Sequence, residues 1–403
     1  RVQAAPAANL SLSPSTGTLY YGVPFSLRML MDTAGEAVVV ADPILLYDAA
    51  LWRIDSVTPN YADPPGAGQF RFLARSACAG GRVQVSVGTP HQTALSGSPL
   101  AIADLLATPL QCLPAAPLSY YFLAAGAGGD SNLIRDDGLG TDLLTGVSGG
   151  VYRGLPPPRG ESADYDADPA AEPVVFRPAT GLWSVRGATS FFLGSSGDIP
   201  VPGDYGGDGK TDPAVFRPAS GLWATRGGGR IYFGGPDDLP LPGDWTGDGT
   251  SDLAVFRPAD GRWAVRNATR FFFGALGDCP VPADFNRDGR LAAAVFRPSS
   301  GLWAARSLTR LSFGLSGDLP VPADYDGDGS EDFAVFRPGS GFWAARSVTR
   351  AFFGASGDIP VPADYAGSGS AGMALFRPLT GWWEIRGITA FCFGQLGDLP
   401  LSR

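Results

Sequence analysis

The 403-residue sequence has one histidine, His91, and one lysine, Lys210. His91 lies outside the repeats described below, so those repeats lack the histidine that a serine–histidine–aspartate triad or a histidine-ligated metal requires. The best apolar stretch is interrupted before it reaches the roughly 18 residues of a membrane-spanning helix. A formal net charge of −9 argues against nucleic acid and anionic membranes as partners. The composition therefore favours a non-enzymatic protein that attracts cations.

Cysteine is also scarce, with four residues and no C-x-x-C pair, so neither a zinc site nor thioredoxin-like redox chemistry is indicated. Cys78 and Cys112 are candidates for a disulfide in an oxidising compartment, worth about 3–4 kcal/mol in the loop-entropy model. Cys279 and Cys392 stand where other repeats carry apolar residues, and we expect both to be small apolar fillers. The chain begins at Arg1 without a methionine, which is typical of a secreted protein whose signal peptide has been removed. We therefore expect an extracellular or cell-surface location.

Glycine and proline, in contrast, are abundant, with 56 and 36 residues that punctuate the whole chain. From Asp164 onward the sequence repeats with a period of 40 residues in six copies. Each copy holds three or four strand-like segments of four to six residues and shows no helical period. Four short strands in each 40-residue unit are typical of a β-propeller blade.

Every copy also carries an arginine in an F-R-P block, a tryptophan and an aspartate in a later turn. We interpret the arginines and turn aspartates as scaffold, either as ion pairs or as turn caps. The tryptophans and the phenylalanines of the F-F-G segments are expected in the core between blades. The first repeat shows these positions as Arg177, Trp183 and Asp198.

The predicted fold class is all-β, with a β-sandwich over residues 1–113 followed by a β-propeller over residues 114–403. Alternation of apolar and polar residues in the stretch VPFSLRMLM, residues 23–31, indicates strands in the first part. Residues 164–403 form the six clear repeats. Residues 114–163 offer three strand-like segments and resemble a degenerate copy. We therefore expect seven blades, with six as the alternative.

The loop at residues 324–332 reads DYDGDGSED and places aspartates at its first, third, fifth and ninth positions, with glycine at the sixth. Calcium takes six to eight oxygen ligands, which alternate side chains and one backbone carbonyl can supply. An EF-hand would have glutamate at the twelfth position, where this chain has Val335 in a strand-like segment. The candidate ligands are the carboxylates of Asp324, Asp326, Asp328 and Asp332 and the carbonyl of Ser330.

The other five copies of this loop keep the pattern to different degrees. The fourth copy has Ala292 at the ninth position, the first has Glu172 there but Pro169 in place of the glycine, and the sixth has lost nearly every ligand. The candidate ligands in these copies are Asp204, Asp208 and Asp212; Asp244, Thr246, Asp248 and Asp252; Asp284, Asn286 and Asp288; and Asp164, Asp166 and Asp168.

The D-x-D-x-D-G-x-x-D spacing resembles the calcium loops of integrin α-subunit propellers and of bacterial FG-GAP or VCBS-type repeats. This resemblance implies a calcium-loop propeller with Ca²⁺ as its cofactor. Residues 10–59 resemble the cohesin-like domains of bacterial secreted proteins, with an opening strand, a long second strand and the later segment LLYDAALWRIDSV. Cohesins bind dockerins, but no dockerin is visible in this sequence, so that partner is not carried over.

These features predict a secreted, calcium-binding adhesion or interaction platform whose partner is an extracellular protein or a glycan. One alternative is a structural protomer that polymerises into a filament or surface layer, with residues 1–9 adding a strand to a neighbouring sandwich. Another alternative is a propeller lectin with a glycan pocket around tryptophan and arginine in each repeat. An enzyme is disfavoured, because propeller glycosidases use uniquely placed carboxylates and arginines and the F-R-P motif occurs six times here.

Overall fold

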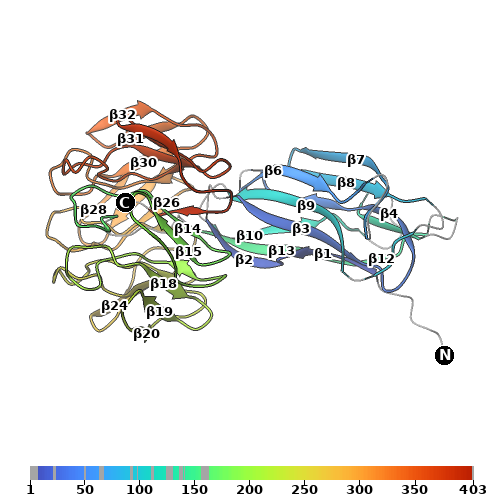
Figure 1. Cartoon of the computed structure of the whole chain (residues 1–403), viewed down its shortest axis with the longest axis horizontal. Helices are drawn as coiled ribbons and strands as arrows, with labels where there is room; N and C mark the ends of the chain where they lie inside the picture. Colours follow the sequence, from blue (N-terminus) through green and yellow to red (C-terminus); the bar gives the residue numbers. More distant parts are fainter. Residues whose placement is uncertain are drawn as a thin grey trace. The chain divides into compact units, whose positions relative to one another are not determined.

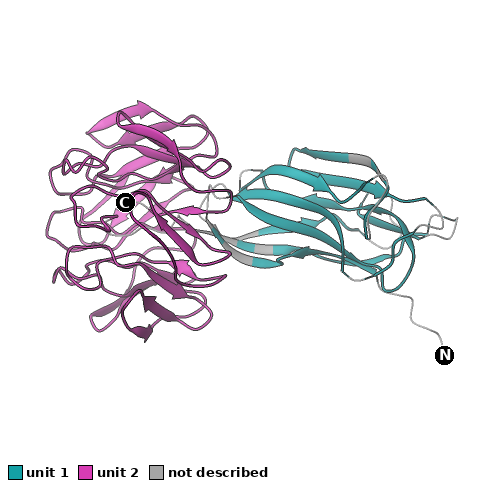
Figure 2. Cartoon of the chain, viewed as in Figure 1, with its two compact units in different colours: residues 1–19, 24–154 teal, residues 20–23, 155–403 magenta. Residues whose placement is uncertain are grey.

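The computed structural model describes residues 8–20, 24–49, 51–62, 68–90, 94–97, 99–109, 113–123, 130–135, 139, 141–155 and 163–401. The chain divides into two compact units, residues 1–19 with 24–154 and residues 20–23 with 155–403 (Figure 2). We call them the sandwich unit and the repeat unit. Every regular element in the described residues is a β-strand. Within that part of the chain, no helix has the length and apolar character needed to span a membrane.

The sandwich unit contains two sheets that share one core (Figure 1). The first has the strand order β12-β1-β3-β9-β6, and the second has the order β11-β4-β8-β5-β10-β13-β2 with β7 also paired to β8. The strands are β1 Ala8–Ser13, β2 Thr16–Tyr20, β3 Phe25–Asp32, β4 Val38–Asp42, β5 Ile44–Leu46, β6 Trp52–Pro59, β7 Phe72–Ala79, β8 Arg82–Gly88, β9 Leu100–Pro109, β10 Leu113–Tyr120, β11 Asn132–Arg135, β12 Leu144–Ser148 and β13 Gly150–Leu155.

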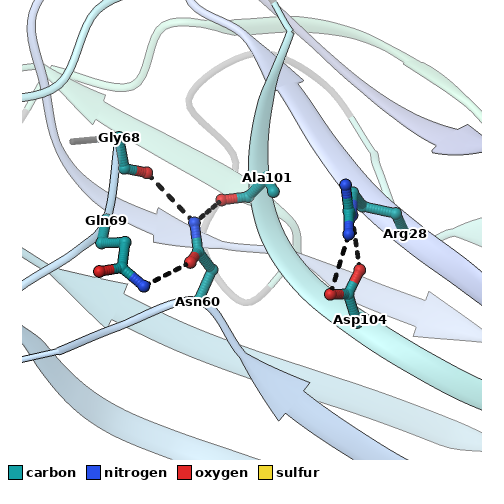
Figure 3. A network of polar contacts seen from close by, with 6 residues as sticks. All are labelled: Arg28, Asn60, Gly68, Gln69, Ala101 and Asp104. Atoms are coloured by element: carbon teal, nitrogen blue, oxygen red, sulfur yellow. Dashed lines mark hydrogen bonds and ion pairs between the residues drawn. The ribbon is translucent and has the colours of Figure 1, made fainter. Parts of the chain in front are cut away.

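The alternating pattern expected for residues 23–31 is confirmed over the part that the structure describes. Leu27, Met29 and Met31 are buried, whereas the alternate residues Ser26 and Arg28 are exposed. Successive side chains of a strand point to opposite faces, so β3 presents one apolar face to the core. The exposed Arg28 forms an ion pair with Asp104 on the neighbouring strand β9, at 2.6 Å (Figure 3).

The predicted seventh blade is wrong, because β10 to β13 belong to the sandwich unit. β11 pairs with β4, β12 runs parallel to β1, and β13 pairs with β10. Leu133, Leu144 and Tyr152 are fully buried in the same cluster as Leu10 and Met29. These apolar side chains complete the sandwich core, so the boundary lies near residue 154 rather than at residue 113.

Hydrogen bonds of side-chain amides connect the residues that follow β6 to strand β9. The amide nitrogen of Asn60 donates to the carbonyl oxygens of Gly68 at 3.1 Å and Ala101 at 2.9 Å, and its amide oxygen accepts from Gln69 at 3.2 Å (Figure 3). Such bonds satisfy backbone groups that no strand partner reaches.

The repeat unit consists of six four-stranded sheets, each covering most of one 40-residue repeat. Trp and Phe on the two middle strands are opposite one another, as with Trp183 and Phe176, and pack at a ring distance of 5.3 Å. The strands, sheet by sheet, are β14 Val174–Arg177, β15 Leu182–Val185, β16 Ser190–Phe192 and β37 Leu399–Pro400; β17 Ile199–Pro200, β18 Ala214–Arg217, β19 Leu222–Thr225 and β20 Arg230–Tyr232; β21 Leu239–Pro240, β22 Ala254–Arg257, β23 Arg262–Val265 and β24 Thr269–Phe272; β25 Cys279–Pro280, β26 Ala294–Arg297, β27 Leu302–Ala305 and β28 Thr309–Ser312; β29 Leu319–Pro320, β30 Ala334–Arg337, β31 Phe342–Ala345 and β32 Thr349–Phe352; and β33 Ile359–Pro360, β34 Ala374–Arg377, β35 Trp382–Ile385 and β36 Thr389–Cys392.

The first of these sheets is completed by the C-terminal strand. β37 pairs antiparallel with β14, with Phe176 opposite Leu399. Buried residues of the first and sixth repeats, such as Trp183 and Trp383, belong to one core cluster, which also includes Val215 of the second sheet. The six sheets therefore make a cyclic series of neighbours rather than an open row.

The expected scaffold of arginines and turn aspartates is confirmed in all six sheets. Arg337 Nε lies 2.6 Å from Asp318 Oδ1, and the second Asp318 oxygen accepts from Arg337 Nη2 at 2.8 Å and from the backbone N–H of Leu315 at 2.8 Å. The aspartates are almost fully buried, whereas the arginines are partly exposed. The pairs are Arg177–Asp398, Arg217–Asp198, Arg257–Asp238, Arg297–Asp278, Arg337–Asp318 and Arg377–Asp358.

Candidate metal centres in the acidic loops

The first aspartate of each acidic loop shapes the turn. Asp324 accepts hydrogen bonds from the backbone N–H groups of Gly327, Asp328 and Gly329 at 2.7, 3.1 and 2.8 Å. Gly329 has a φ of +87°, so the glycine expected at the sixth position is required by the left-handed backbone. Asp364 makes equivalent bonds to Ser368 and Gly369 in the loop that has lost its other carboxylates. The turn therefore does not depend on a full ligand set.

Backbone hydrogen bonds join the six loops into a ring. In each case, the N–H of the eighth residue of one loop donates to the carbonyl of the first aspartate in the preceding loop, at 2.6–2.8 Å, and the first loop donates to the sixth. The ring places all the loop carboxylates at one end of the repeat unit. The six bonds are Thr211 to Asp164, Ser251 to Asp204, Leu291 to Asp244, Glu331 to Asp284, Ala371 to Asp324 and Ala171 to Asp364.

Two loops bring three carboxylates together. Oxygen atoms of Asp324, Asp326 and Asp332 lie within 4.8 Å of one another, and so do oxygen atoms of Asp164, Asp166 and Glu172. Three converging carboxylates form an oxygen-rich, negatively charged donor set of the kind that Ca²⁺ prefers.

The fifth-position aspartates have a more local role. Asp328 accepts from the N–H of Ser330 at 2.8 Å, and Asp168, Asp208, Asp248 and Asp288 make the same bond two residues along. The structure therefore places Asp328 and the Ser330 amide in a turn bond beside the cluster formed by Asp324, Asp326 and Asp332.

Burial and repulsion raise the pKa values of the ninth-position carboxylates Asp332 and Glu172. Burial, together with the charges of Asp326, Asp324 and Asp328, raises the pKa of Asp332 to about 6, although a hydrogen bond from the Tyr325 amide acts in the opposite direction. Burial is also the main reason why the pKa of Glu172 rises to about 7. A bound cation would reverse this effect, because an opposite charge favours the ionised carboxylate.

The second and third loops hold their ninth-position aspartates in the same way. Asp212 accepts from the N–H groups of Tyr205 and Gly206, both at 3.1 Å, and Asp252 accepts from Trp245 and Thr246, both at 3.0 Å. Burial raises the pKa of Asp212. In the third loop, the buried hydroxyl oxygen of Thr246 has no hydrogen-bond partner among the described residues. An orphaned oxygen at the third loop position fits an oxygen-seeking cation.

The fourth loop receives a carboxylate from the next repeat, which sequence reasoning missed. Ala292 stands at its ninth position, but Glu331 Oε2 accepts a hydrogen bond from the N–H of Asp284. Asn286 of this loop donates to Asp288 at 2.9 Å. The available signal was glutamate at the eighth position of the fifth loop, where the other repeats have Thr, Ser, Leu or Ala.

The tryptophan and the F-R-P arginine of each repeat do not form the repeated glycan pocket that the lectin alternative places around them. The six repeat tryptophans are buried, and each indole N–H donates to a backbone carbonyl, as Trp343 does to Phe353 at 2.9 Å. The arginines are committed to the buried aspartates. The first aromatic residue of the F-F-G segment is exposed rather than buried, with Phe272 and Phe352 exposed by 70% and 76%, whereas the second, as at Phe273 and Phe353, is partly buried.

The remaining candidate residues have mixed outcomes. Cys279 is buried as expected for a filler, whereas Cys392 is exposed at the outer strand position that Phe192 occupies in the first repeat. Cys78 is not disulfide-bonded, and its sulfur lies 3.6 Å from the hydroxyl oxygen of Tyr47. Cys112 and His91 lie outside the described residues.

No family model matches the sequence, and no curated protein matches it. Among solved structures, the chain is similar to a non-cellulosomal cohesin from Archaeoglobus fulgidus, with 11% identity, a TM-score of 0.28, and coverage of 37% of this chain and 91% of that one. It is also similar to the cohesin CaCohA2 from Clostridium acetobutylicum, with 14% identity, a TM-score of 0.29 and coverage of 37% and 91%. A third similar structure is the Clostridium thermocellum complex Coh-OlpC-Doc435, with 12% identity, a TM-score of 0.28 and coverage of 38% and 99%. TM-scores this low do not establish a shared function.

Proposed function

We propose that this chain is a secreted or cell-surface, non-enzymatic interaction protein whose repeat unit is a six-bladed β-propeller stabilised by Ca²⁺. The observation that carries the proposal is the convergence of Asp324, Asp326 and Asp332 within 4.8 Å in a loop that recurs every 40 residues. A solvated acidic turn does not require three carboxylates to approach so closely, since like charges repel.

Calcium would have a structural role in this protein. Asp324, Asp326 and Asp332 would hold one ion, and Asp164, Asp166 and Glu172 would hold another. When bound, the ion opposes the burial and the repulsion that otherwise raise the pKa values of Asp332 and Glu172. Because backbone bonds link consecutive loops into a ring, stiffening one loop also restrains its neighbours. The result is a rigid end of the repeat unit that suits recognition of an extracellular protein or a glycan.

The distribution of acids supports a binding role rather than catalysis. The six buried turn aspartates are neutralised by arginines, and the loop aspartates accept backbone hydrogen bonds. General acid–base catalysis needs a carboxylate that is free to exchange a proton with a substrate. These acids are instead committed to the scaffold in every repeat.

Calcium titration of the whole chain by isothermal calorimetry tests the proposal. We expect binding with a Kd of about 0.1–1 mM, as in extracellular calcium modules. Asp326→Asn should weaken the affected site by about tenfold or more, because it removes a ligand charge while the Asp324 turn bonds remain. The matched control Ser368→Ala, in the sixth loop, should leave the titration unchanged. Absence of calcium-dependent heat would refute the calcium proposal.

Sedimentation velocity in millimolar calcium and in chelator distinguishes the interaction platform from the structural protomer. Ala8 and Asn9, which the protomer model assigns to an exchanged arm, already pair within their own sheet with β12 and β3. We therefore expect a monomer of 41.9 kDa in both buffers. Large species that disappear when residues 1–9 are deleted would favour the polymer instead.

A further inference from the structure

The repeat unit contains a cavity of about 730 Å³ between its second and third sheets. It is bounded by two acidic loops and by the turns that follow β19 and β23, so both repeats contribute to its wall. Small-molecule sites usually have volumes of about 300–1,000 Å³. The cavity is therefore large enough for a small organic molecule.

Two residues of the cavity wall differ from their counterparts in all the other repeats. Gly229 replaces the threonine that all five other repeats have, as at Thr269 and Thr309. A Cβ atom added at Gly229 would have no heavy atom within 4 Å, so a larger side chain can be placed at this point of the wall. Asn267 on the facing turn replaces glycine or serine and brings an amide to the cavity.

The cavity also has a guanidinium, that of Arg266, whose junction lacks the phenylalanine on which the equivalent arginine stacks at three other junctions. At three other junctions the arginine at this position stacks on a phenylalanine of the preceding repeat, as Arg226 does over Phe191 at 4.3 Å. The residue that is equivalent to Phe191 at the Arg266 junction is Ile231. Arg266 and this aliphatic side chain both line the cavity. This leaves the N–H groups of Arg266 available on that wall.

The wall combines hydrogen-bonding groups of every kind. Arg266 offers donors, Asp248 offers the carboxylate oxygen that its turn bonds to Thr250 do not use, and Asn267 and Thr225 each offer both kinds of group. Ile231 and Leu253 add apolar surface at the same site. Both charge signs are present, so a ligand with a net charge would be repelled by one set of groups. A molecule with many hydroxyl groups and apolar C–H faces matches this lining.

We propose that this cavity binds a neutral saccharide, as a free mono- or disaccharide or as one unit of a glycan. The hydroxyl groups would donate to Asp248 and accept from Arg266 and Asn267, while a C–H face would pack on Ile231. The inference deepens the proposed binding role by naming a ligand class, but it does not require calcium in any loop.

Calorimetric and tryptophan-fluorescence titrations of the whole chain test this site, using glucose, galactose, mannose, N-acetylglucosamine, maltose and cellobiose. At least one sugar should bind saturably, with a Kd near 1 mM. Gly229→Thr should weaken that binding at least tenfold, because it places a branched side chain on the wall that the sugar would contact. Its matched control, Gly235→Thr, enters open space elsewhere in the same repeat, where other repeats have side chains, and should bind normally.

Several results would overturn the saccharide site. These are no binding of any sugar, equal binding by Gly229→Thr, or binding of the zwitterion glycine betaine in place of the sugars. Melting curves of both variants establish that they fold. Each titration is repeated with calcium and with chelator, which separates the two proposals. Calcium binding without sugar binding would leave the proposed function standing and remove the saccharide site, and the reverse result would do the opposite.

Discussion

In the sandwich unit, strands far apart in the sequence pair with one another, and their buried side chains form a single cluster that runs from Ala8 to Tyr152. In the repeat unit, most strand pairs join neighbours within one repeat, and the core consists of several similar clusters of tryptophan and phenylalanine. The first unit depends on one non-local core. The second depends on a local pattern used six times, together with the pairing that closes the series.

The comparison explains where each unit is vulnerable. A substitution in the sandwich core affects strands from the whole unit, whereas most changes in one repeat affect that repeat and its two neighbours. The exceptions in the repeat unit are the contacts that link the first repeat to the last. Two separate unfolding transitions are therefore expected in calorimetry, and each prediction below assigns its effect to one of them.

Removal of residues 398–403 should have the largest effect. It deletes Asp398, the partner of Arg177, and the buried Leu399 and Leu401, which together contribute about 5 kcal/mol or more to the repeat unit. The repeat-unit transition should fall sharply or disappear, while the sandwich transition stays in place. Removal of residues 402–403 alone is the control. A repeat-unit transition that survives the longer deletion unchanged would mean that the series does not need its closing strand.

Arg337→Ala should destabilise the repeat unit by about 3 kcal/mol, because it leaves the buried Asp318 carboxylate without its counter-charge. The matched control in the sandwich unit is Arg28→Ala. Both members of that pair are more than half exposed, so the loss there should be at most about 1 kcal/mol. Urea unfolding curves of both variants measure the difference. Equal losses would contradict the distinction between buried and exposed pairs.

Gly206→Asp should improve the second acidic loop as a calcium site. A Cβ atom at Gly206 lies 3.6 Å from Asp212 Oδ2 and 4.0 Å from Asp204 Oδ1, so a carboxylate there would join the two existing ones. In 5 mM calcium, a site with a Kd of about 0.1–1 mM would stabilise the repeat unit by about 1–2 kcal/mol. In chelator, the added charge should be slightly destabilising. Gly235→Asp, outside the loops, controls for net charge and should show no calcium-dependent gain.

The smallest expected effect is on the pH dependence of stability without calcium. The pKa values of Asp332 and Glu172 are raised to about 6 and about 7, so the folded chain holds more protons than the unfolded chain between about pH 4 and pH 7. The stability of the repeat unit should therefore fall as the pH rises through this window in chelator. Asp332→Asn should reduce the change in Tm by an amount on the order of 1–2 °C. Calcium should abolish the difference, and an unchanged profile in Asp332→Asn would rule out Asp332 as a cause.

The two units also differ in how much the sequence reveals. The 40-residue period identified the strands, the Trp core and the Arg–Asp pairs, because the same local contacts recur. It could not identify β10 to β13, which carry no repeated marker and are fixed by burial of Leu133, Leu144 and Tyr152 against distant strands. Contacts between distant segments were also missed in the acidic loops. Spacing within one loop predicted that Asp324, Asp326 and Asp332 lie together, as the structure has them. Glu331, in contrast, contacts Asp284, which is 47 residues away in the sequence, and no spacing rule includes it.

The pairing of β37 with β14 has a consequence for synthesis. Arg177 and Asp398 are 221 residues apart, so β14 is made long before its outer partner exists. Until β37 emerges, one edge of the first sheet has unpaired backbone groups, and exposed strand edges invite pairing with other chains. A chain that is still without β37 is therefore more prone to aggregation than the folded protein, and protection of that edge arrives only with β37.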